Sequence, residues 1–277
     1  MLGQEVFSRL KASSALDVIG TYNSKQPSNL DSYRKFSASS SAQELTELIN
    51  GASYVINCIA VLKLSIDEKN AGSVQLATEI NSNFPRSLAE LASKQSTNVI
   101  HISTDGVFSG NSESPLSESS VPLPNDVYGK SKLAGEAAER NVINIRTSII
   151  GRDPTYQRGL LEWFLKQPEQ SSIQGYDDIW HGVTNGQLAE LIKNVVENDC
   201  FAKARAESNV HHFVPNNPVT KADLLAIFKR MFNKDITINK VVNPNGTVNR
   251  SLTTCYKTLL DCYTGKTDIE SALKDLK

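Results

Sequence analysis

The stretch Ser53-Tyr-Val-Ile-Asn-Cys-Ile-Ala60 is a nearly continuous apolar run with the length of a β-strand. Such a run is typical of a strand in a parallel sheet, because helices cover both faces of that sheet. A similar run, Asn98-Val-Ile-His-Ile-Ser-Thr104, follows a long helical segment, and residues 142–149 form a third. This alternation of buried strands and helices predicts an α/β fold with a doubly wound parallel sheet.

The pattern continues toward both ends of the chain. Before the first apolar run, we predict a helix at residues 2–10, strands at 17–22 and 33–37, and a helix at 42–50. Between the first two runs, residues 74–93 predict a long helix interrupted near Pro85. After residue 150, we predict helices at 159–166, 184–197 and 220–232, strands at 211–214 and 236–242, and a polar helical tail from Ser251. Residues 111–120 predict a loop long enough to be a mobile flap. These elements divide the chain into residues 1–150 and a smaller part, residues 151–277. The predicted strand at 211–214 is a candidate for pairing with the main sheet.

Composition excludes several classes of protein. The chain has 277 residues, a formal net charge of −1, 39% hydrophobic residues and 21% charged residues. It is long enough for a full core, and its charge favours neither nucleic acid nor an anionic membrane. The four cysteines are scattered, and no spacing resembles a metal site, so we expect reduced thiols, no metal and a cytoplasmic location.

The carboxyl ends of the predicted strands are polar. They read Tyr22-Asn23-Ser24-Lys25, Asn57-Cys58-Ile59-Ala60, Ser103-Thr104-Asp105 and Arg146-Thr147-Ser148. Ligands of open α/β sheets bind outside these ends. We therefore expect the functional site at this edge.

The segment Asp126-Val-Tyr-Gly-Lys-Ser-Lys-Leu-Ala-Gly-Glu136 predicts the start of a helix, capped by Asn125 or Asp126. Tyr128 and Lys132 are four residues apart, so they project from one helical face. A nearby ammonium would lower the pKa of the phenol and make it a better proton donor to a carbonyl oxygen. Spacing alone is equally compatible with an ordinary surface helix.

Together these segments resemble the extended short-chain dehydrogenase/reductase family, in particular its dTDP-4-dehydrorhamnose reductase-like, sugar-nucleotide-binding branch. The matching pieces are Gly3, Asn57-Cys-Ile-Ala60, Ile102-Ser-Thr-Asp-Gly-Val-Phe-Ser-Gly110, Val127-Tyr-Gly-Lys-Ser-Lys-Leu-Ala-Gly-Glu136 and Ile145-Arg-Thr147. They cover about the first 150 residues in the family's order. The resemblance implies that residues 1–150 are a Rossmann-like dinucleotide-binding domain and that residues 151–277 face the substrate.

The resemblance also implies roles for single residues. Tyr128 would protonate the carbonyl oxygen of a 4-keto nucleotide sugar while a nicotinamide hydride adds to the carbon. Lys132 would lower the pKa of Tyr128 and hold the nicotinamide ribose, and Thr104 would bind the substrate oxygen, with Ser103 as the alternative. Asp105, Arg146 and His181 would contact the substrate, although Arg146 has an equally good structural interpretation and His181 is better explained as a packed or surface histidine.

The expected cofactor contacts are Gly3, Tyr22, Asn23, Lys25, Asn57, Cys58, Ile59, Ala60, Ser103, Tyr128 and Lys132. Because no carboxylate ends the strand at 17–22, whereas Lys25 follows it, we expect NADPH rather than NADH. A homodimer is compatible with the sequence.

Two departures from the family pattern affect these expectations. Gly3 matches the third glycine of the dinucleotide fingerprint, but the first strand and the first two glycines have no counterpart. We therefore expect the sheet to lack its first strand, through N-terminal truncation or, alternatively, through a real loss of cofactor binding. Gly106 stands where the family commonly has tyrosine, which leaves the substrate's identity open. The alternative functions are an epimerase or dehydratase on the same scaffold and a non-catalytic sugar-nucleotide-binding subunit. A dehydratase is disfavoured because Thr104-Asp105-Gly106 lacks the usual Asp-Glu pair.

Overall fold

The computed structural model describes residues 1–27, 30–113 and 115–276. Its main sheet contains four parallel strands in the order β10-β5-β4-β3. These strands are β3 (Tyr54–Asn57), β4 (Asn98–Ile102), β5 (Val142–Arg146) and β10 (Val210–His212). The three apolar runs of the sequence are thus adjacent strands, and the predicted return of the strand near residue 211 is confirmed by its parallel pairing with β5. The α/β, Rossmann-like prediction is confirmed.

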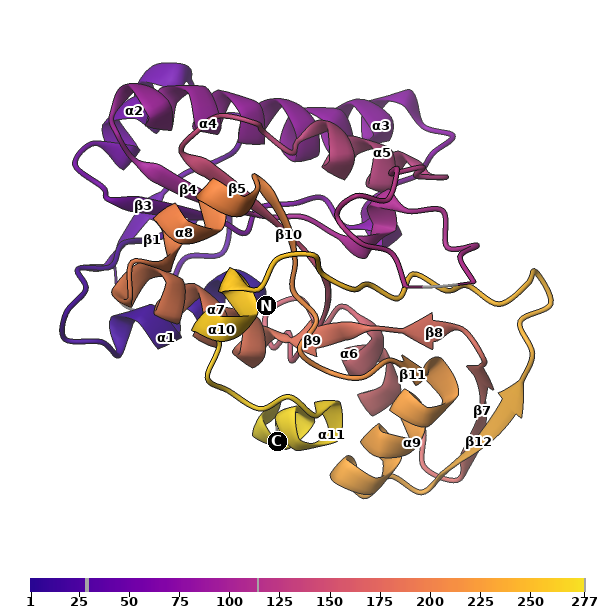
Figure 1. Cartoon of the computed structure of the whole chain (residues 1–277). Coiled ribbons are helices and arrows are strands. Elements are labelled where there is room, and N and C mark those ends of the chain that lie inside the picture. The colour runs from indigo at the N-terminus through magenta and orange to yellow at the C-terminus, as the bar shows by residue number, and fades with distance from the viewer. Residues whose placement is uncertain (28–29, 114, 277) are drawn as a thin grey trace.

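Helices cover both faces of this sheet (Figure 1). Helices α2 (Ala42–Ile49) and α4 (Phe84–Lys94) pack on the face that carries Val99 and Val142. On the other face, Ile100 and Ile143 pack against α1 (Leu2–Lys11), α7 (Asn185–Glu197), α8 (Cys200–Glu207) and α10 (Thr258–Cys262). Because alternate residues of one strand face opposite layers, the strands are apolar along their whole length.

Local signals explain where several helices begin. Ser41 and Glu44 form a capping box at α2, and Thr184 and Gln187 form another at α7. The predicted cap of α9 (Lys221–Phe232) is confirmed, since the Thr220 side chain accepts the N–H of Asp223. Around Pro85 the chain stays helical: α3 (Ala71–Thr78) continues through a π-helical turn at Glu79–Asn83 into α4. Pro85 lies just after this π-helical turn and has no N–H to donate, so the irregular hydrogen bonding of the helix lies where proline removes a backbone donor.

The N-terminal strands are separate from the main sheet. Strands β1 (Gly20–Tyr22) and β2 (Tyr33–Lys35) form a parallel pair of their own, and both are shorter than predicted. Within the described residues neither strand pairs with β3. A cavity of about 940 Å³ is lined by residues of α1, α2, β1 and β3, among them Val6, Ile19, Leu45 and Ile56. The expectation that a further strand belongs in this sheet stays a prediction.

The second half of the chain contributes to two cores. Helices α7, α8 and α10 belong to the core of the main sheet, as described above. A separate core brings together α6 (Leu160–Leu165), α9 and α11 (Ile269–Leu273). Beside it lie three strand pairs: β7 (Ser171–Tyr176) with β12 (Ile236–Val241), β8 (Ile179–Trp180) with β11 (Val219–Thr220), and β6 (Ser148–Ile150) with β9 (Gly182–Thr184). The division at residue 150 stays a prediction.

Two sequence-based predictions for the loops are wrong. The segment after Ser251 is not a polar helical tail, because α10 and α11 are short and bury Leu259 and Ile269. Residues 111–120, of which residue 114 lies outside the described part, are not a free flap. Leu116 N–H donates to Ser251 O at 2.8 Å, and the Glu118 carboxylate accepts from His212 N and Cys255 N at 2.7 and 2.8 Å. These bonds hold the loop against β10 and the C-terminal segment.

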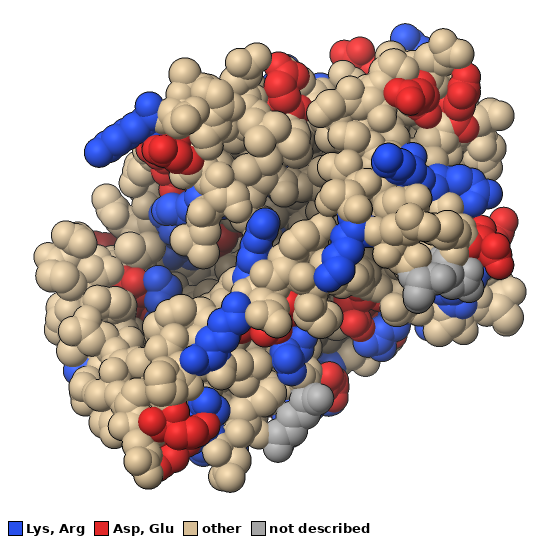
Figure 2. Space-filling view, turned by 180° about the vertical axis from the view of Figure 1, so that it is seen from behind, with Lys and Arg blue, Asp and Glu red and all other residues tan. Residues whose placement is uncertain are grey.

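On the face shown in Figure 2, Lys and Arg side chains are interspersed with Asp and Glu, so neither positive nor negative charge predominates there. Among the described residues, no helix combines the length and apolar character needed to cross a membrane.

Candidate active site

Thr104 and Tyr128 meet at the end of β4. Thr104 follows that strand, and Tyr128 lies in the first turn of α5 (Val127–Ala134), whose N-cap Asp126 accepts the Gly129 N–H at 2.7 Å. The close approach of α5 to this loop depends on Gly129, since a Cβ there would collide with Gly106 O and lie 2.8 Å from Pro124 Cβ. The Thr104 side chain lies near the Tyr128 hydroxyl and acts to lower the pKa of this phenol.

The Tyr128 phenol keeps its proton at neutral pH. Burial raises its pKa to about 12, and the nearby Thr104 side chain only partly opposes this effect. The nearby carboxylates of Asp105 and Asp126 raise the pKa further. The predicted lowering of this pKa is therefore wrong, because burial and the two carboxylates raise it and Lys132 is not among the groups that shift it.

Lys132 is deeply buried, with 2% of its surface exposed. Its Nζ donates to Ile102 O at 2.6 Å and lies 3.2 Å from His101 Nε2. Burial lowers the pKa of Lys132 to about 8, although the Glu136 carboxylate acts in the opposite direction. Lys132 thus lies close to the border between ammonium and amine at physiological pH.

Ser103 and Arg146 belong to a structural ion pair. Arg146 is paired in a bidentate manner with Glu136, with Nε–Oε1 and Nη2–Oε2 distances of 2.8 and 2.7 Å, and the two side chains are 4% and 6% exposed. Ser103 Oγ donates to the same carboxylate at 2.6 Å. This arrangement favours the structural interpretation of Arg146 over contact with a substrate phosphate, and it turns Ser103 away from a role as the alternative to Thr104.

Most of the predicted cofactor residues come from the start of α1 and the ends of β1 and β3, and they line one cavity. Gly3 packs beside Cys58, where an added Cβ would lie 3.6 Å from the Cys58 Cβ, so the start of α1 meets the end of β3. Burial raises the pKa of Cys58 to about 12, which keeps the thiol uncharged. The Asn57 amide accepts the N–H of Ile59 at 3.1 Å and shapes the turn that leads to Ala60.

Tyr22, Asn23 and Lys25 lie at the end of β1, where they line the 940 Å³ cavity. Lys25 Nζ donates to Thr155 O at 3.4 Å, a long hydrogen bond. Gly3, Asn57, Cys58 and Ile59 line the same cavity, and Cys58 also lies close enough to Lys132 to affect its pKa.

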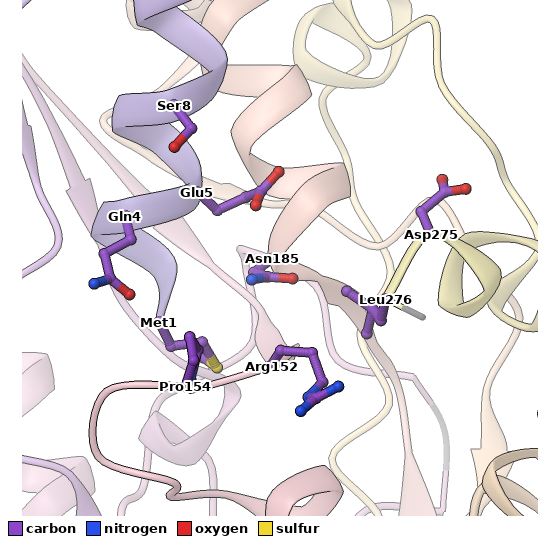
Figure 3. Close-up of a pocket in the computed structure, with 9 residues that line it drawn as sticks. All are labelled: Met1, Gln4, Glu5, Ser8, Arg152, Pro154, Asn185, Asp275 and Leu276. Atoms are coloured by element: carbon purple, nitrogen blue, oxygen red, sulfur yellow. The ribbon is translucent and has the colours of Figure 1, made fainter. Parts of the chain in front are cut away.

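A second, smaller cavity lies at the start of α1 (Figure 3). It has a volume of about 250 Å³ and is lined by Met1, Gln4, Arg152 and Asn185, among others. Asn185 is the first residue of α7, so two helix N-termini lie at this cavity. Helix N-termini favour anions. Arg152 is paired with Glu162 at 2.9 Å.

His181 and Asp105 have protein partners. Both His181 nitrogens face the backbone: Nε2 is 2.7 Å from Asn216 O, and Nδ1 accepts from Leu252 N at 3.2 Å. This favours the structural interpretation of His181. Asp105 accepts from Thr104 Oγ1 at 3.1 Å, and burial raises its pKa although the nearby Arg250 opposes the shift.

Two further residues contribute to the site. His101, a histidine inside a predicted core strand, contacts both Lys132 and Asn57. Arg250, a possible substrate contact that no sequence motif assigns, reaches the loop after Thr104 from the far end of the chain and donates to Phe108 O at 2.9 Å. The position of His101 on β4, just before Ser103 and Thr104, was the available signal for its role. Among the described residues there is no His, Cys, Asp and Glu cluster fit for a metal ion.

The parallel sheet with helices on both faces is a Rossmann-like fold, and Thr104, Tyr128 and Lys132 lie near the end of its central strand β4. The RmlD substrate-binding domain family matches residues 1–263. The chain belongs to this family.

Three comparisons describe its relatives. The chain is 33% identical over 127 residues to a probable low-salt glycan biosynthesis reductase, Agl14, of Haloferax volcanii, a match that covers 45% of this chain and 41% of that protein. It is 28% identical over 186 residues to a dTDP-4-keto-6-deoxy-D-glucose reductase of Streptomyces niveus, covering 65% of this chain and 61% of that protein. The matches thus span less than two thirds of these relatives.

The fold is similar to that of a dTDP-4-dehydrorhamnose reductase of Bacillus anthracis solved in complex with NADP. The TM-score is 0.71 at 18% identity, covering 91% of this chain and 92% of that one.

Proposed function

We propose that this protein reduces a 4-keto nucleotide sugar with NADPH and that Tyr128 donates the proton. The observation that carries the proposal is the buried, protonated Tyr128 beside the Thr104 hydroxyl. A phenol with a pKa of about 12 is uncharged at neutral pH and has a proton to give. The names of the relatives, all reductases of this type or of glycan biosynthesis, agree with this chemistry.

The residues present fit a nicotinamide dinucleotide along one edge of the site. The N-terminus of α1 with Gly3 would meet the pyrophosphate, and the uncharged Cys58 thiol adds no repulsion there. Lys25, at the end of β1, suits a 2′-phosphate, which favours NADPH over NADH. When bound, the nicotinamide would supply a hydride to the carbonyl carbon.

The chain's own residues would then handle the substrate oxygen. Thr104 and Tyr128 would both hydrogen-bond this oxygen, and Tyr128 would pass it the phenolic proton as negative charge develops. Lys132, held by Ile102 O, would stabilise the phenolate left behind. Thr104 and Lys132 are buried, which would limit the access of water to the transfer.

The test uses the full chain with NADPH and dTDP-4-dehydrorhamnose, following the loss of NADPH absorbance. Tyr128→Phe should lower kcat by about 10²–10⁴-fold, the usual contribution of a positioned acid. Tyr176→Phe is the matched control, because that hydroxyl bonds only locally to Gln174 at 2.8 Å. An unchanged rate in Tyr128→Phe would remove Tyr128 from the mechanism.

The alternative of a non-catalytic binding subunit is favoured by one observation, the separation of β1 and β2 from the main sheet. Calorimetry distinguishes the two. A binding subunit would bind the nucleotide sugar without turnover at any NADPH concentration, whereas a reductase would bind NADPH and turn over.

A further inference from the structure

A continuous line of hydrogen bonds connects the candidate cofactor edge to Lys132. Ile59 N–H donates to Asn57 Oδ1 at 3.1 Å, and Asn57 Nδ2 lies 3.0 Å from His101 Nδ1. His101 Nε2 in turn lies 3.2 Å from Lys132 Nζ. The side chains are 3%, 1% and 2% exposed for Asn57, His101 and Lys132, so water does not supply the missing partners.

The direction of each bond in this line follows from its first donor. A backbone N–H can only donate, so the Asn57 atom facing Ile59 is the oxygen, and the Asn57 nitrogen faces His101. That amide nitrogen donates, so His101 Nδ1 accepts and carries no proton. The neutral imidazole then carries its proton on Nε2, directed at Lys132.

An ammonium cannot accept that proton, because it has no lone pair. Lys132 Nζ can accept from His101 only as the neutral amine, while one of its own N–H groups donates to Ile102 O. A doubly protonated His101 does not resolve the conflict, since burial and Lys132 both hold the pKa of this imidazole well below its usual value.

We infer that His101 is a positioning residue that couples the protonation of Lys132 to the turn at Asn57 and Ile59. When Lys132 gains a proton from solvent, Nζ must donate to His101 Nε2. The ring keeps one proton, now on Nδ1, which needs the Asn57 oxygen as its acceptor. The Asn57 amide then turns over, and the Ile59 N–H is released at the candidate cofactor edge.

Other ionisable groups around Lys132 set the balance between the two states. Glu136 faces Lys132 from the end of α5 and favours the ammonium, but it is itself paired with Arg146 of β5. Cys58 faces Lys132 from the end of β3 and stays an uncharged thiol near the amino group of Met1. The local charges therefore leave room for His101 to determine the state of Lys132.

The structural part of the inference is tested without activity, by ¹⁵N NMR of histidine-labelled full-length protein between pH 6 and 9.5. His101 is assigned from the signal that disappears in His101→Gln. We expect the Nε2–H tautomer at high pH and conversion to Nδ1–H as the pH falls through about 8, where Lys132 titrates. In Lys132→Met the conversion should vanish. His181 is an internal reference, because Leu252 N–H holds it in the Nε2–H tautomer.

A His101 tautomer that stays constant across this range, or converts equally in Lys132→Met, would overturn the inference.

The catalytic part rests on the proposed reductase function and is tested by pH profiles. The variants His101→Gln and His101→Leu both remove the imidazole N–H that donates to the Lys132 amine, so both should raise the apparent pKa of the Lys132-dependent limb of kcat. His101→Gln should raise it the more, by about one unit, because its oxygen also accepts from the ammonium. A merely structural role would reduce kcat in both variants without shifting the limb, and that result would overturn the catalytic part. Failure of the reductase proposal is recognised separately, since the NMR result does not depend on turnover.

Discussion

The centre of the parallel sheet and the region beside its edge strand β3 differ in how completely they are packed. Around β4, β5 and α5 the side chains of Lys132, His101 and Arg146 are buried and hydrogen-bonded. Around β1 and β3 the strands do not pair with each other in the described part of the chain, and a cavity of about 940 Å³ is lined by both. The catalytic side of the site is therefore held by contacts that do not depend on the N-terminal strands.

This difference separates two requirements of a dehydrogenase. Placing a proton donor against a substrate oxygen needs only β4 and α5, whereas placing a dinucleotide needs the start of α1 and the ends of β1 and β3 together. In this chain the packing around β4 and α5 places the proton donor, whereas the placement of a dinucleotide depends on the region that contains the cavity of about 940 Å³. Four predictions test the contrast.

The largest effect is expected from filling the cavity. A designed extension before Met1, consisting of about five apolar β-forming residues followed by Gly-x-x-Gly, should pair with both β1 and β3. Each buried apolar side chain contributes about 1.5–3 kcal/mol, against about 1–2 kcal/mol per ordered backbone residue. We expect the Tm to rise by about 10 °C, given about 2–4 °C per kcal/mol, and NADPH binding to become tighter by calorimetry.

An extension of equal length rich in Ser and Asn is the control and should change neither quantity. If the apolar extension also leaves the Tm and the hydrogen exchange of the β1 and β3 amides unchanged, the cavity is not a strand site.

Breaking the buried ion pair should destabilise the packed side strongly. Arg146→Ala leaves the Glu136 carboxylate buried without its partner, which costs about 3–5 kcal/mol. Arg230→Ala removes a pair whose side chains are 58% and 42% exposed, and it should cost about 0–1 kcal/mol. Urea denaturation gives both values, and similar costs for the two variants would contradict the structural role of Arg146.

Two isoleucines that are register partners on β3 and β4 compare the two sides directly. Ile100 is fully buried, whereas Ile56 opposite it lines the cavity. Ile100→Ala should cost about 2–5 kcal/mol, while Ile56→Ala enlarges a space that is already empty and should cost about half as much or less. Equal free-energy losses in denaturant titrations would show that the β3 edge is as tightly packed as β4.

The smallest effect concerns the contact between α5 and the loop after Thr104. Gly129→Ala places a Cβ against Gly106 O and Pro124, so we expect a loss of about 1–3 kcal/mol from overpacking. Gly186→Ala, in the first turn of α7, is the control, since its nearest neighbour is 3.7 Å away and alanine favours the helix. Thermal unfolding of both variants should therefore move in opposite directions; a stable Gly129→Ala protein would mean that α5 can shift away from Thr104.

Much of the architecture was predictable because it rests on local patterns. Continuous apolar runs identified β3, β4 and β5, and the capping residue Thr220 identified the start of α9. Strand β7 carries polar residues on its exposed side and was missed. Its strand conformation comes from pairing with β12, a partner about 65 residues away, rather than from its own composition.

For the site, the sequence by itself determined that Tyr128 and Lys132 share a helical face, because an i, i+4 spacing has only one outcome on an α-helix. Only the tertiary structure decided that Ser103 and Arg146 join Glu136 and that His101 contacts Lys132. It also decided the direction of the Tyr128 pKa shift. Burial and long-range partners set the charge of a side chain, and neither is encoded in the spacing of residues along the chain.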